Sequence, residues 1–501
     1  MKNKLKILDC TLRDGGYYTN WDFDSVTVEN YIKHTNNLPL DYIEIGYRNP
    51  KNINIYNGEF YYTPLNTLKL FKQKSKHQIA IMIDYKNVQI NEINSLLEDC
   101  QGYVNLIRIA INPESLDNCQ GFIDKIKSLG FEIALNIMYL SMWDIDKIKN
   151  KIKNIENIDY LYLADSYGAV FPKKLKKILN EIKEVSNCPI GFHPHDNLEL
   201  AFSNTLTSIE NGIDIVDSSI LGMGRGAGNL KTELLLIKLS CNDNNRFKQY
   251  DSLSSLIDIF TPLKLKYNWG SDISYKFAGI NSLPQKEIMS LKLSKNYKFS
   301  QIIRYFDNKD KEKISLKDIR DQRGLKNFET IIIGGGPTIL KHKEAIDFFL
   351  NKNKDRYNII LSSSKSSEAT PNKNKHMYQI VLGSDMIEHK YLNNNNVKYI
   401  FPSTQGLEQI NLKENFYSIK MESCTKDQVN HLEVSMYFAS NILRSKKVFL
   451  IGFDGFDPSD NYYDVFKANQ EVIDKYSNSV SIISLTRTKY SVNLDSIYSY
   501  L

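Results

Sequence analysis

Two histidines stand two residues apart in the segment GFHPHDN, at His193 and His195, and they are two of only eight histidines in the chain. On an extended strand, side chains two residues apart point the same way, so both imidazoles can reach one metal ion. Asp14, in DCTLRDGG near the start of the chain, would add a carboxylate oxygen. A mixed nitrogen and oxygen ligand set favours a borderline or hard divalent ion with open coordination positions. Manganese or magnesium therefore fits best, and zinc is less favoured because no thiolate joins the set.

These residues need a scaffold that brings distant segments together, and the first 225 residues predict one. Short β-branched apolar runs alternate there with longer, charged, helix-like stretches, which is the pattern of repeated βα units and a parallel sheet. Eight such runs, at spacings of about 25 to 40 residues, predict a closed (β/α)8 TIM barrel. The runs begin at Lys6, Tyr42, Ile79, Leu106, Glu132, Tyr160, Pro189 and Ile215.

Barrel enzymes carry their chemistry at the carboxyl ends of the strands, and this is where the polar residues fall. The first predicted strand ends in a stretch that holds Asp14, and the seventh ends at the two histidines. The eighth runs into a glycine-rich segment that contains Asn229. Strand eight separates strands one and seven in a closed barrel, so Asp14 is expected near His193 and His195.

Four segments together resemble the DRE-TIM metallolyases, a family that includes 3-hydroxy-3-methylglutaryl-CoA lyase, isopropylmalate synthase and 4-hydroxy-2-oxovalerate aldolase. They are DCTLRDGGYYTNWDF, IEIGYRNP, GFHPHDN and GMGRGAGNLKTE, and the resemblance covers about residues 5 to 284. It implies metal ligands at Asp14, His193 and His195, with Asn229 as a further ligand or a neighbour of the ligands.

The resemblance also implies catalytic roles near the metal. Arg13 would stabilise the oxygen of an enolate, which suits a permanently charged guanidinium. Glu44 occupies the family's acidic position on the second strand, where a buried ion pair with Arg13 and a direct chemical role are both open. Bacterial 4-hydroxy-2-oxovalerate aldolases have a histidine base three residues after the ligand aspartate, and this chain has Tyr17 there. Tyr17 could relay a proton through water or orient the aldehyde, or another group could be the base.

The segment after the eighth strand separates the branches of the family. Claisen-condensing synthases typically carry Glu-Arg after the second glycine, whereas this chain has Arg225 and Gly226 in GMGRGAGN. That form is similar to the pyruvate-dependent aldolases. The resemblance therefore implies an aldolase or lyase that joins or splits a pyruvate-like α-keto acid enolate and an aldehyde, with surface-glycan sugar synthesis as one setting. An acyl-CoA condensing enzyme or lyase is the alternative within the family.

A second α/β pattern follows the barrel. Six apolar runs within about 175 residues predict an open, doubly wound, Rossmann-like sheet rather than a second barrel. The highly charged stretch between the two patterns predicts a linker. We therefore expect a barrel domain at residues 1–305, a charged linker at 306–326 and a second domain at 327–501.

The second domain carries its own candidate site. In IIIGGGPTIL a strand runs through three glycines into a helix, where backbone amides could face an anion. The segments GGGPTI, VLGSD, LIGFDG and ISLTRTKY resemble the Rossmann-like domains of the DUF115 or MptE-like group, found in surface-glycan pathways. An inert assembly domain is one alternative, and a nucleotide-sugar binding protein or transferase with the barrel as accessory is another. The resemblance implies a nucleotide or diphosphate site lined by Gly335, Gly336, Asp385, Asp454 and Arg487.

Composition excludes several other classes of protein. The chain has 64 Lys and Arg against 58 Asp and Glu, a net charge of +6 without a basic block among aromatic residues, which argues against nucleic acid as a partner. A membrane span is not expected, since no run of about 18 apolar residues occurs. The six cysteines lack a CxxC pair, so neither a disulfide framework nor a zinc knuckle is indicated. We expect a cytoplasmic homo-oligomer that acts on small molecules.

Overall fold

The computed structural model divides into two compact units, Met1–Met289 and Ser290–Leu501. The structure describes residues 5–51, 56–241, 247–293, 299–307, 316–322, 325, 328–354, 356–367, 376–382, 392, 394–402, 413–421, 430–458, 460 and 462–501.

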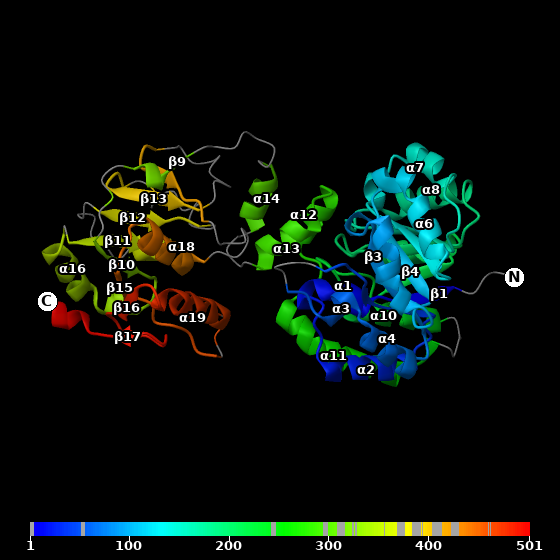
Figure 1. Ribbon diagram of the computed structural model, residues 1–501, viewed down its shortest axis with the longest axis horizontal. Helices are drawn as coiled ribbons and strands as arrows, with labels where there is room; N and C mark the ends of the chain where they lie inside the picture. The colour runs from blue at the N-terminus through cyan, green and yellow to red at the C-terminus, as the bar shows by residue number, and fades with distance from the viewer. Residues whose placement is uncertain are drawn as a thin grey trace. The chain divides into compact units, whose positions relative to one another are not determined.

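The first unit is a closed barrel of eight parallel strands in chain order, coloured blue to green in Figure 1. The predicted TIM barrel is therefore confirmed. The barrel closes where β8 pairs with β1, from Lys6 beside Ile215 to Asp9 beside Ser218. The strands are β1 (Lys6–Asp9), β2 (Tyr42–Tyr47), β3 (Gln78–Asp84), β4 (Leu106–Ile111), β5 (Glu132–Ile137), β6 (Tyr160–Asp165), β7 (Ile190–Pro194) and β8 (Ile215–Ser218).

Amphipathic helices cover the outside of the barrel (Figure 1). In α8 (Pro172–Lys183), Pro172 occupies the first turn, and the buried residues Leu175, Ile178, Leu179 and Ile182 follow the spacing of one helix face. The other helices of this unit are α1 (Thr11–Thr19), α2 (Ser25–Thr35), α3 (Glu59–Tyr62), α4 (Leu65–Lys74), α5 (Ile93–Leu97), α6 (Gln120–Lys127), α7 (Ile145–Ile152), α9 (Ala201–Glu210), α10 (Thr232–Ser240), α11 (Tyr250–Tyr267) and α12 (Ile273–Ile280). Helix α13 (Gln285–Leu293) begins in this unit and extends past its last residue, Met289.

Buried side chains of alternate residues form layers inside the barrel. The layer nearest the amino ends of the strands is apolar and includes Leu106 and Ile215. Two residues further along the same strands the inward side chains are charged, Arg108 on β4 and Asp217 on β8, and Glu44 on β2 joins them. A charged layer thus lies between the apolar floor of the barrel and the carboxyl ends of its strands.

The first strand is shorter than the sequence suggested. It ends at Asp9, whose Oδ1 accepts a hydrogen bond from the Thr11 amide at 3.0 Å, and helix α1 begins at Thr11. Arg13, Asp14 and Tyr17 therefore lie on a buried helix above the strand and not on an extended strand end. The helix still directs them toward the mouth of the barrel.

The second unit is an open sheet of nine parallel strands in the order β17-β16-β15-β10-β11-β12-β13-β14-β9 (Figure 1). The strand β10 lies inside the sheet, with β11 on one side and β15 on the other. The later strands therefore extend the sheet in both directions from β10. The strands are β9 (Lys317–Asp318), β10 (Glu329–Ile333), β11 (Tyr357–Leu361), β12 (Met377–Ile380), β13 (Val397–Phe401), β14 (Phe416–Ser418), β15 (Lys447–Ile451), β16 (Ser481–Ser484) and β17 (Asn493–Leu494).

Both faces of this sheet are buried. Successive residues of β10 belong to different apolar clusters, Ile332 to one and Ile331 and Ile333 to the other, because side chains alternate across a strand. The α/β architecture predicted for this part is confirmed. The helices of the unit are α14 (Phe299–Asp307), α15 (Thr338–Lys341), α16 (Lys343–Lys352), α17 (Ser364–Ser367), α18 (His431–Tyr437) and α19 (Tyr463–Ser477).

Part of the segment predicted as a linker takes part in this sheet. Strand β9 pairs with β14 through Lys317 beside Tyr417 and Asp318 beside Ser418, and the side chain of Ile319 is fully buried in an apolar cluster. The described residues 316–322 thus belong to the second unit.

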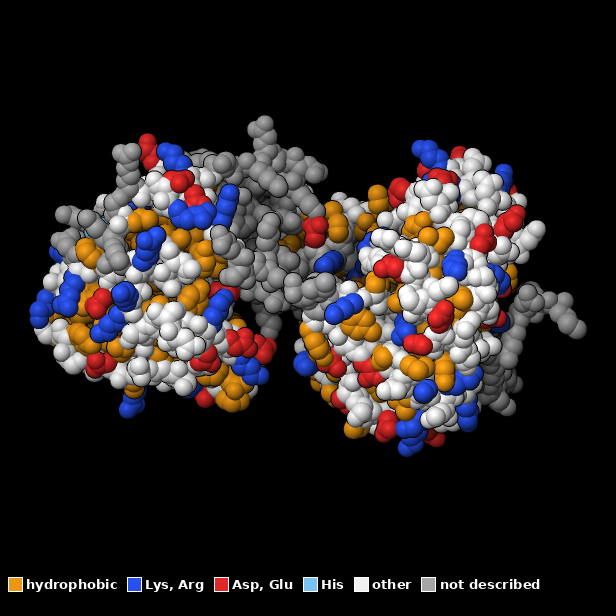
Figure 2. Space-filling model, viewed as in Figure 1, with side chains coloured by type: hydrophobic (Ala, Val, Ile, Leu, Met, Phe, Trp, Pro, Cys, Tyr) orange, Lys and Arg blue, Asp and Glu red, His pale blue; other side chains and the backbone are white. Residues whose placement is uncertain are grey.

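The surface carries both signs of charge. On the face shown in Figure 2, Lys and Arg side chains are interspersed with Asp and Glu over the barrel. Among the described residues, no helix combines the length and the apolar character that crossing a membrane requires.

Candidate metal centre

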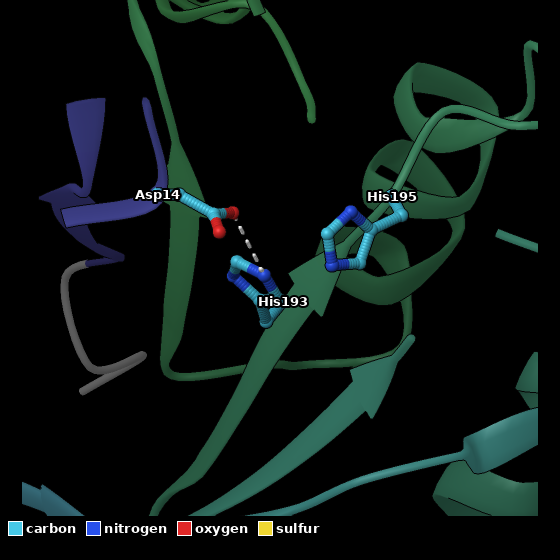
Figure 3. Close-up of side chains that lie close together, drawn as sticks. All are labelled: Asp14, His193 and His195. Atoms are coloured by element: carbon cyan, nitrogen blue, oxygen red, sulfur yellow. Dashed lines mark ion pairs between the residues drawn. The ribbon is translucent and has the colours of Figure 1, made fainter. Parts of the chain in front are cut away.

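Three buried side chains converge at the carboxyl end of the barrel: Asp14 from α1, His193 from β7, and His195 just beyond β7 (Figure 3). One ligand atom from each lies within 4.8 Å of the other two. The Nε2 atom of His193 is 3.6 Å from Oδ2 of Asp14, and the two imidazole rings are 4.9 Å apart. The structure therefore brings together the three residues that the sequence predicted as metal ligands.

The protonation states of these groups suit a cation. Burial, the neighbouring His193 and nearby arginines lower the pKa of His195 to about 3, despite the opposing effect of Asp14, so its imidazole is neutral at pH 7. Burial disfavours the Asp14 carboxylate, but Arg13, the two histidines and the Asn229 amide hold its pKa well below the usual range. A carboxylate and a neutral imidazole are the forms that bind a divalent ion.

Two buried polar atoms beside this triad make no hydrogen bond in the described part of the chain: Nδ1 of His195 and Oδ1 of Asn229. The amide nitrogen of Asn229 donates to Oδ2 of Asp14 at 2.5 Å, which places Asn229 beside the ligands. Buried polar atoms without a partner are costly, and a bound cation or its water would satisfy them. The donor set of two imidazoles and one carboxylate fits a divalent metal ion.

Arg13 is fixed beside the triad by two carboxylates. Its Nε donates to Oε2 of Glu44 and its Nη1 donates to Oδ1 of Asp14, each at 2.8 Å. The remaining terminal nitrogen, Nη2, makes no hydrogen bond to a described residue. The guanidinium plane is thus held in place with one edge available, and Glu44 forms the ion pair that was one of its two predicted roles.

The charged layer below the triad was missed at the sequence level. Arg108 donates to Glu44 at 2.7 Å and to Asp217 at 2.5 Å, and it is fully buried. Asp217 also accepts a hydrogen bond from Nδ1 of His193 at 2.8 Å. One network therefore joins Arg13 and His193 through the barrel interior. The signal was present in the sequence, because a charged residue interrupts the apolar runs LIRIAI and IVDSSIL.

Aromatic side chains line the mouth of the barrel near the triad. The hydroxyl of Tyr17 is 3.0 Å from the hydroxyl of Tyr47, and its ring packs edge-on against Trp21. The guanidinium of Arg225 lies 5.3 Å from the centre of the Tyr17 ring. Tyr17 therefore lies at the mouth of the barrel, and Arg225 is a second cation there for which the sequence predicted no role.

The residues predicted to form a site in the second unit are only partly brought together. Gly336 lies against Asp454, so a Cβ at Gly336 would be 2.8 Å from the Asp454 carboxyl carbon. Gly335 is on the same turn, and the exposed Arg487 follows β16, the strand beside β15. Asp385 lies outside the described residues.

The glycine turn uses much of its own hydrogen-bonding capacity. The Gly334 amide donates to Ile451 and the Gly336 amide to Gly452, at 2.8 and 2.9 Å. The Thr338 amide donates to Asp454 at 2.9 Å. These three amides are engaged within the chain, and a carboxylate occupies the position where the sequence suggested an anion.

Comparisons with known proteins cover the barrel. A family model described as HMGL-like matches residues 4–259. The N-terminal domain of a candidate aldolase from Bacteroides vulgatus, a solved structure, is 44% identical, with a TM-score of 0.56, and the match covers 60% of this chain and 99% of that one.

Two curated proteins are similar over the same part. The 4-hydroxy-2-oxovalerate aldolase of Bacillus thuringiensis is 25% identical over 56% of this chain and 83% of its own length. The oxaloacetate decarboxylase of Mycobacterium tuberculosis is 23% identical over 60% of this chain and 89% of its own length. With the family model matching half of the chain and the buried Asp14, His193 and His195 cluster in place, this chain belongs to the HMGL-like family of metal-dependent aldolases and lyases.

Proposed function

We propose that this protein is a divalent-metal-dependent aldolase or lyase that makes or breaks a carbon–carbon bond between the enolate of a pyruvate-like α-keto acid and an aldehyde. The observation that carries the proposal is the buried cluster of Asp14, His193 and His195, with the edge of Arg13 beside it. Similarity to 4-hydroxy-2-oxovalerate aldolases supports the reaction class.

The residues present would hold manganese or magnesium through Asp14, His193 and His195, with Asn229 adjacent. Bound there, such an ion supplies Lewis-acid polarisation of a carbonyl oxygen. The chain provides the rest of the electrostatics. Arg13, fixed at Nε and Nη1, directs its Nη2 to the oxygen that gains negative charge when the α-carbon loses a proton or the carbon–carbon bond breaks.

Arg13 needs little reorganisation in this role, because its ion pairs already fix the plane of its guanidinium group. Glu44 accepts from both Arg13 and Arg108 and thereby positions the catalytic arginine from below. A preorganised donor of this kind stabilises developing charge more effectively than water, which must reorient.

In this proposal the aldehyde oxygen binds beside the Tyr17 hydroxyl. This hydroxyl is paired with that of Tyr47, whose pKa is raised well above the usual range, chiefly by burial, so Tyr47 stays protonated at neutral pH. In this proposal Tyr17 donates a proton to the aldehyde oxygen when the carbon–carbon bond forms, and solvent water returns a proton to Tyr17. When the bond breaks, the proton passes from the substrate hydroxyl through Tyr17 to water, so a histidine is not needed at this position.

The test separates enolisation from carbon–carbon bond chemistry. Pyruvate is incubated in deuterium oxide with the full chain, with and without manganese, and loss of the methyl proton signal is followed by NMR. We expect exchange only with the metal, and new aldol product when an aldehyde is added. Exchange without any aldehyde-dependent product would favour a pyruvate-forming lyase such as a decarboxylase, and absence of exchange would contradict the proposal.

For the second unit we propose nucleotide or sugar-nucleotide binding at the carboxyl edge of β10 and β15. The supporting observation is the strand order, since the chain winds away from β10 in opposite directions at this edge, where parallel sheets bind ligands. Because the Gly334, Gly336 and Thr338 amides are engaged, contacts would come from Gly335, Asp454 and Arg487. To test this proposal, the full-length wild type and its Asp454→Ala variant are titrated with fluorescent nucleotides. The proposal would be contradicted if none of these nucleotides bound.

A further inference from the structure

Arg225 differs from the other arginines of the barrel interior in having no carboxylate partner. Arg13 pairs with Asp14 and Glu44, and Arg108 pairs with Glu44 and Asp217. For Arg225, neither an ion pair nor a hydrogen bond of the side chain is found among the described residues, and its buried Nε is unpartnered. Arg225 as a whole is partly exposed, and a positive charge with a buried Nε and no anion beside it points to a partner that arrives with a ligand.

The backbone that carries Arg225 is firmly held. The backbone carbonyl of Arg225 accepts a hydrogen bond from the backbone amide of Gly228 at 3.2 Å. The backbone amide of Asn229 donates to the carbonyl of Gly222 at 3.0 Å. The hydroxyl of Tyr18 donates to the carbonyl of Gly226 at 2.7 Å. Gly226 and Gly228 have φ values of 67° and 84°, which permit the tight turn. The arginine thus extends from a preorganised loop.

The guanidinium of Arg225 lies over the Tyr17 ring at the mouth of the barrel. Its Cζ atom is 5.3 Å from the centre of that ring, and the Tyr17 hydroxyl is 3.0 Å from the Tyr47 hydroxyl. Burial opposes the charge on Arg225, but the neighbouring Tyr17 and Asp14 groups raise its pKa, so the side chain is charged. A cation over the Tyr17 ring can bind a negatively charged group on a ligand that also reaches the Tyr17 hydroxyl.

We propose that Arg225 binds an anionic group, a carboxylate or a phosphate, on the acceptor aldehyde. The inference rests on the proposed aldolase function and defines its substrate class. The donor keto acid is accounted for by the metal ligands and Arg13. A group bound against both Arg225 and Tyr17 belongs to the molecule whose oxygen Tyr17 faces, and that molecule is the aldehyde. The planar fork of arginine suits bidentate recognition of either anion.

Two matched pairs of aldehydes test the inference with the manganese-loaded full chain. Succinic semialdehyde and butanal differ by a carboxylate, and glyceraldehyde 3-phosphate and glyceraldehyde differ by a phosphate. The ratio of kcat/KM within each pair is measured with pyruvate as donor. We expect wild type to favour the anionic member of one pair, and that pair identifies the anion.

Substitution then removes the preference. In Arg225→Gln we expect the ratio for that pair to fall by about 30-fold, as for loss of a charge-assisted hydrogen bond. Arg225→Lys, which keeps the charge and loses the fork, should fall between, and it serves as the test if the glutamine variant does not fold. The control is Lys231→Gln, which removes an exposed positive charge at the end of the same segment and should leave the ratio unchanged.

Three results would overturn the inference: no preference in wild type, an unchanged ratio in both Arg225 variants, or a loss in Arg225→Gln that is already present in pyruvate deuterium exchange without aldehyde. The last result would assign Arg225 to the donor carboxylate. Failure of the proposed function is distinguishable, because wild type would then show no metal-dependent pyruvate exchange at all.

Discussion

Asp217 accepts a hydrogen bond from Nδ1 of His193 at 2.8 Å, and this leaves Nε2 as the ring nitrogen that faces Asp14. The carboxylate fixes both the tautomer and the ring orientation of the predicted ligand. Asp217 is held in turn by Arg108, so the metal centre is built on an ion pair across the interior of the barrel.

Asp217→Asn should weaken manganese binding. The variant keeps the side chain's size but removes the charge that holds the His193 proton, and loss of such a partner typically costs about 10- to 100-fold in affinity. Free manganese measured by electron paramagnetic resonance gives the dissociation constant. Asp159→Asn is the matched control, because Asp159 also forms an ion pair and accepts a backbone amide, but it precedes β6 at the opposite end of the barrel. Equal affinity in wild type and Asp217→Asn would refute the positioning role.

Arg13→Lys should lower turnover by about 100-fold or more while manganese remains bound. Lysine keeps the positive charge but cannot maintain the Glu44 and Asp14 contacts and also present Nη2 to a developing oxyanion. Rates of pyruvate exchange and manganese affinity are measured on the same preparation. A variant within a few-fold of wild type would show that Arg13 is structural only.

The stability of the metal-free barrel should depend on pH through His195. Its pKa is about 3 in the folded chain, because burial and His193 disfavour the charged ring, and about 6.5 when unfolded. Between these values the unfolded chain binds a proton that the folded chain does not, so the free energy of unfolding falls as pH falls below 6.5. At pH 5 the loss is on the order of 2 kcal/mol.

Tryptophan fluorescence during urea unfolding measures this effect in the barrel alone, since Trp21, Trp143 and Trp269 are the three tryptophans of the chain and all lie before residue 290. Burial raises the pKa of Asp165 to about 6. This shift makes the free energy of unfolding rise as the pH falls over the same range, which opposes the effect of His195. The effect of His195 is therefore measured as the difference in the free energy of unfolding between wild type and His195→Asn. A difference that does not change between pH 7.5 and pH 5 would contradict the assignment.

The barrel should fold and enolise pyruvate without the second unit. Every residue placed in the enolate chemistry, from Arg13 to Asn229, lies in the unit Met1–Met289, and the Met289 sulfur accepts from the Gly226 amide at 3.1 Å. A fragment of residues 1–293 keeps that contact and the whole of α13. We expect it to show native tryptophan emission and metal-dependent exchange. A folded, metal-loaded fragment that cannot exchange pyruvate protons would instead indicate an active site that needs both units.

The sequence predicted the strands that are long and buried. All eight barrel strands and six strands of the open sheet overlap the apolar runs from which they were inferred, because buried parallel strands read as continuous hydrophobic segments. The three strands that were missed, β9, β14 and β17, have two or three residues each and lie at or next to the sheet edges. Lys317 and Asp318 of β9 are charged, so a strand there depends on pairing with β14 rather than on local pattern.

The ligand residues were predictable because they lie at or just beyond the carboxyl ends of strands that converge in a barrel. Arg108 and Asp217 were not identified, since they act through contacts across the barrel that become evident only once Glu44 and His193 face them. The unpartnered state of Arg225 is likewise a property of the folded mouth. In the second unit, the engagement of the Gly336 amide by Gly452 could not be anticipated from the glycine motif.

Whether Asp14, His193 and His195 form a catalytic metal centre is tested by measuring manganese binding and pyruvate deuterium exchange in wild type, His195→Ala and His34→Ala. His34 lies on the outer helix α2 and is the matched control. We expect one tightly bound manganese and metal-dependent exchange in wild type and His34→Ala, and loss of both in His195→Ala with unchanged tryptophan emission. Full manganese binding and exchange in a folded His195→Ala protein would contradict this assignment.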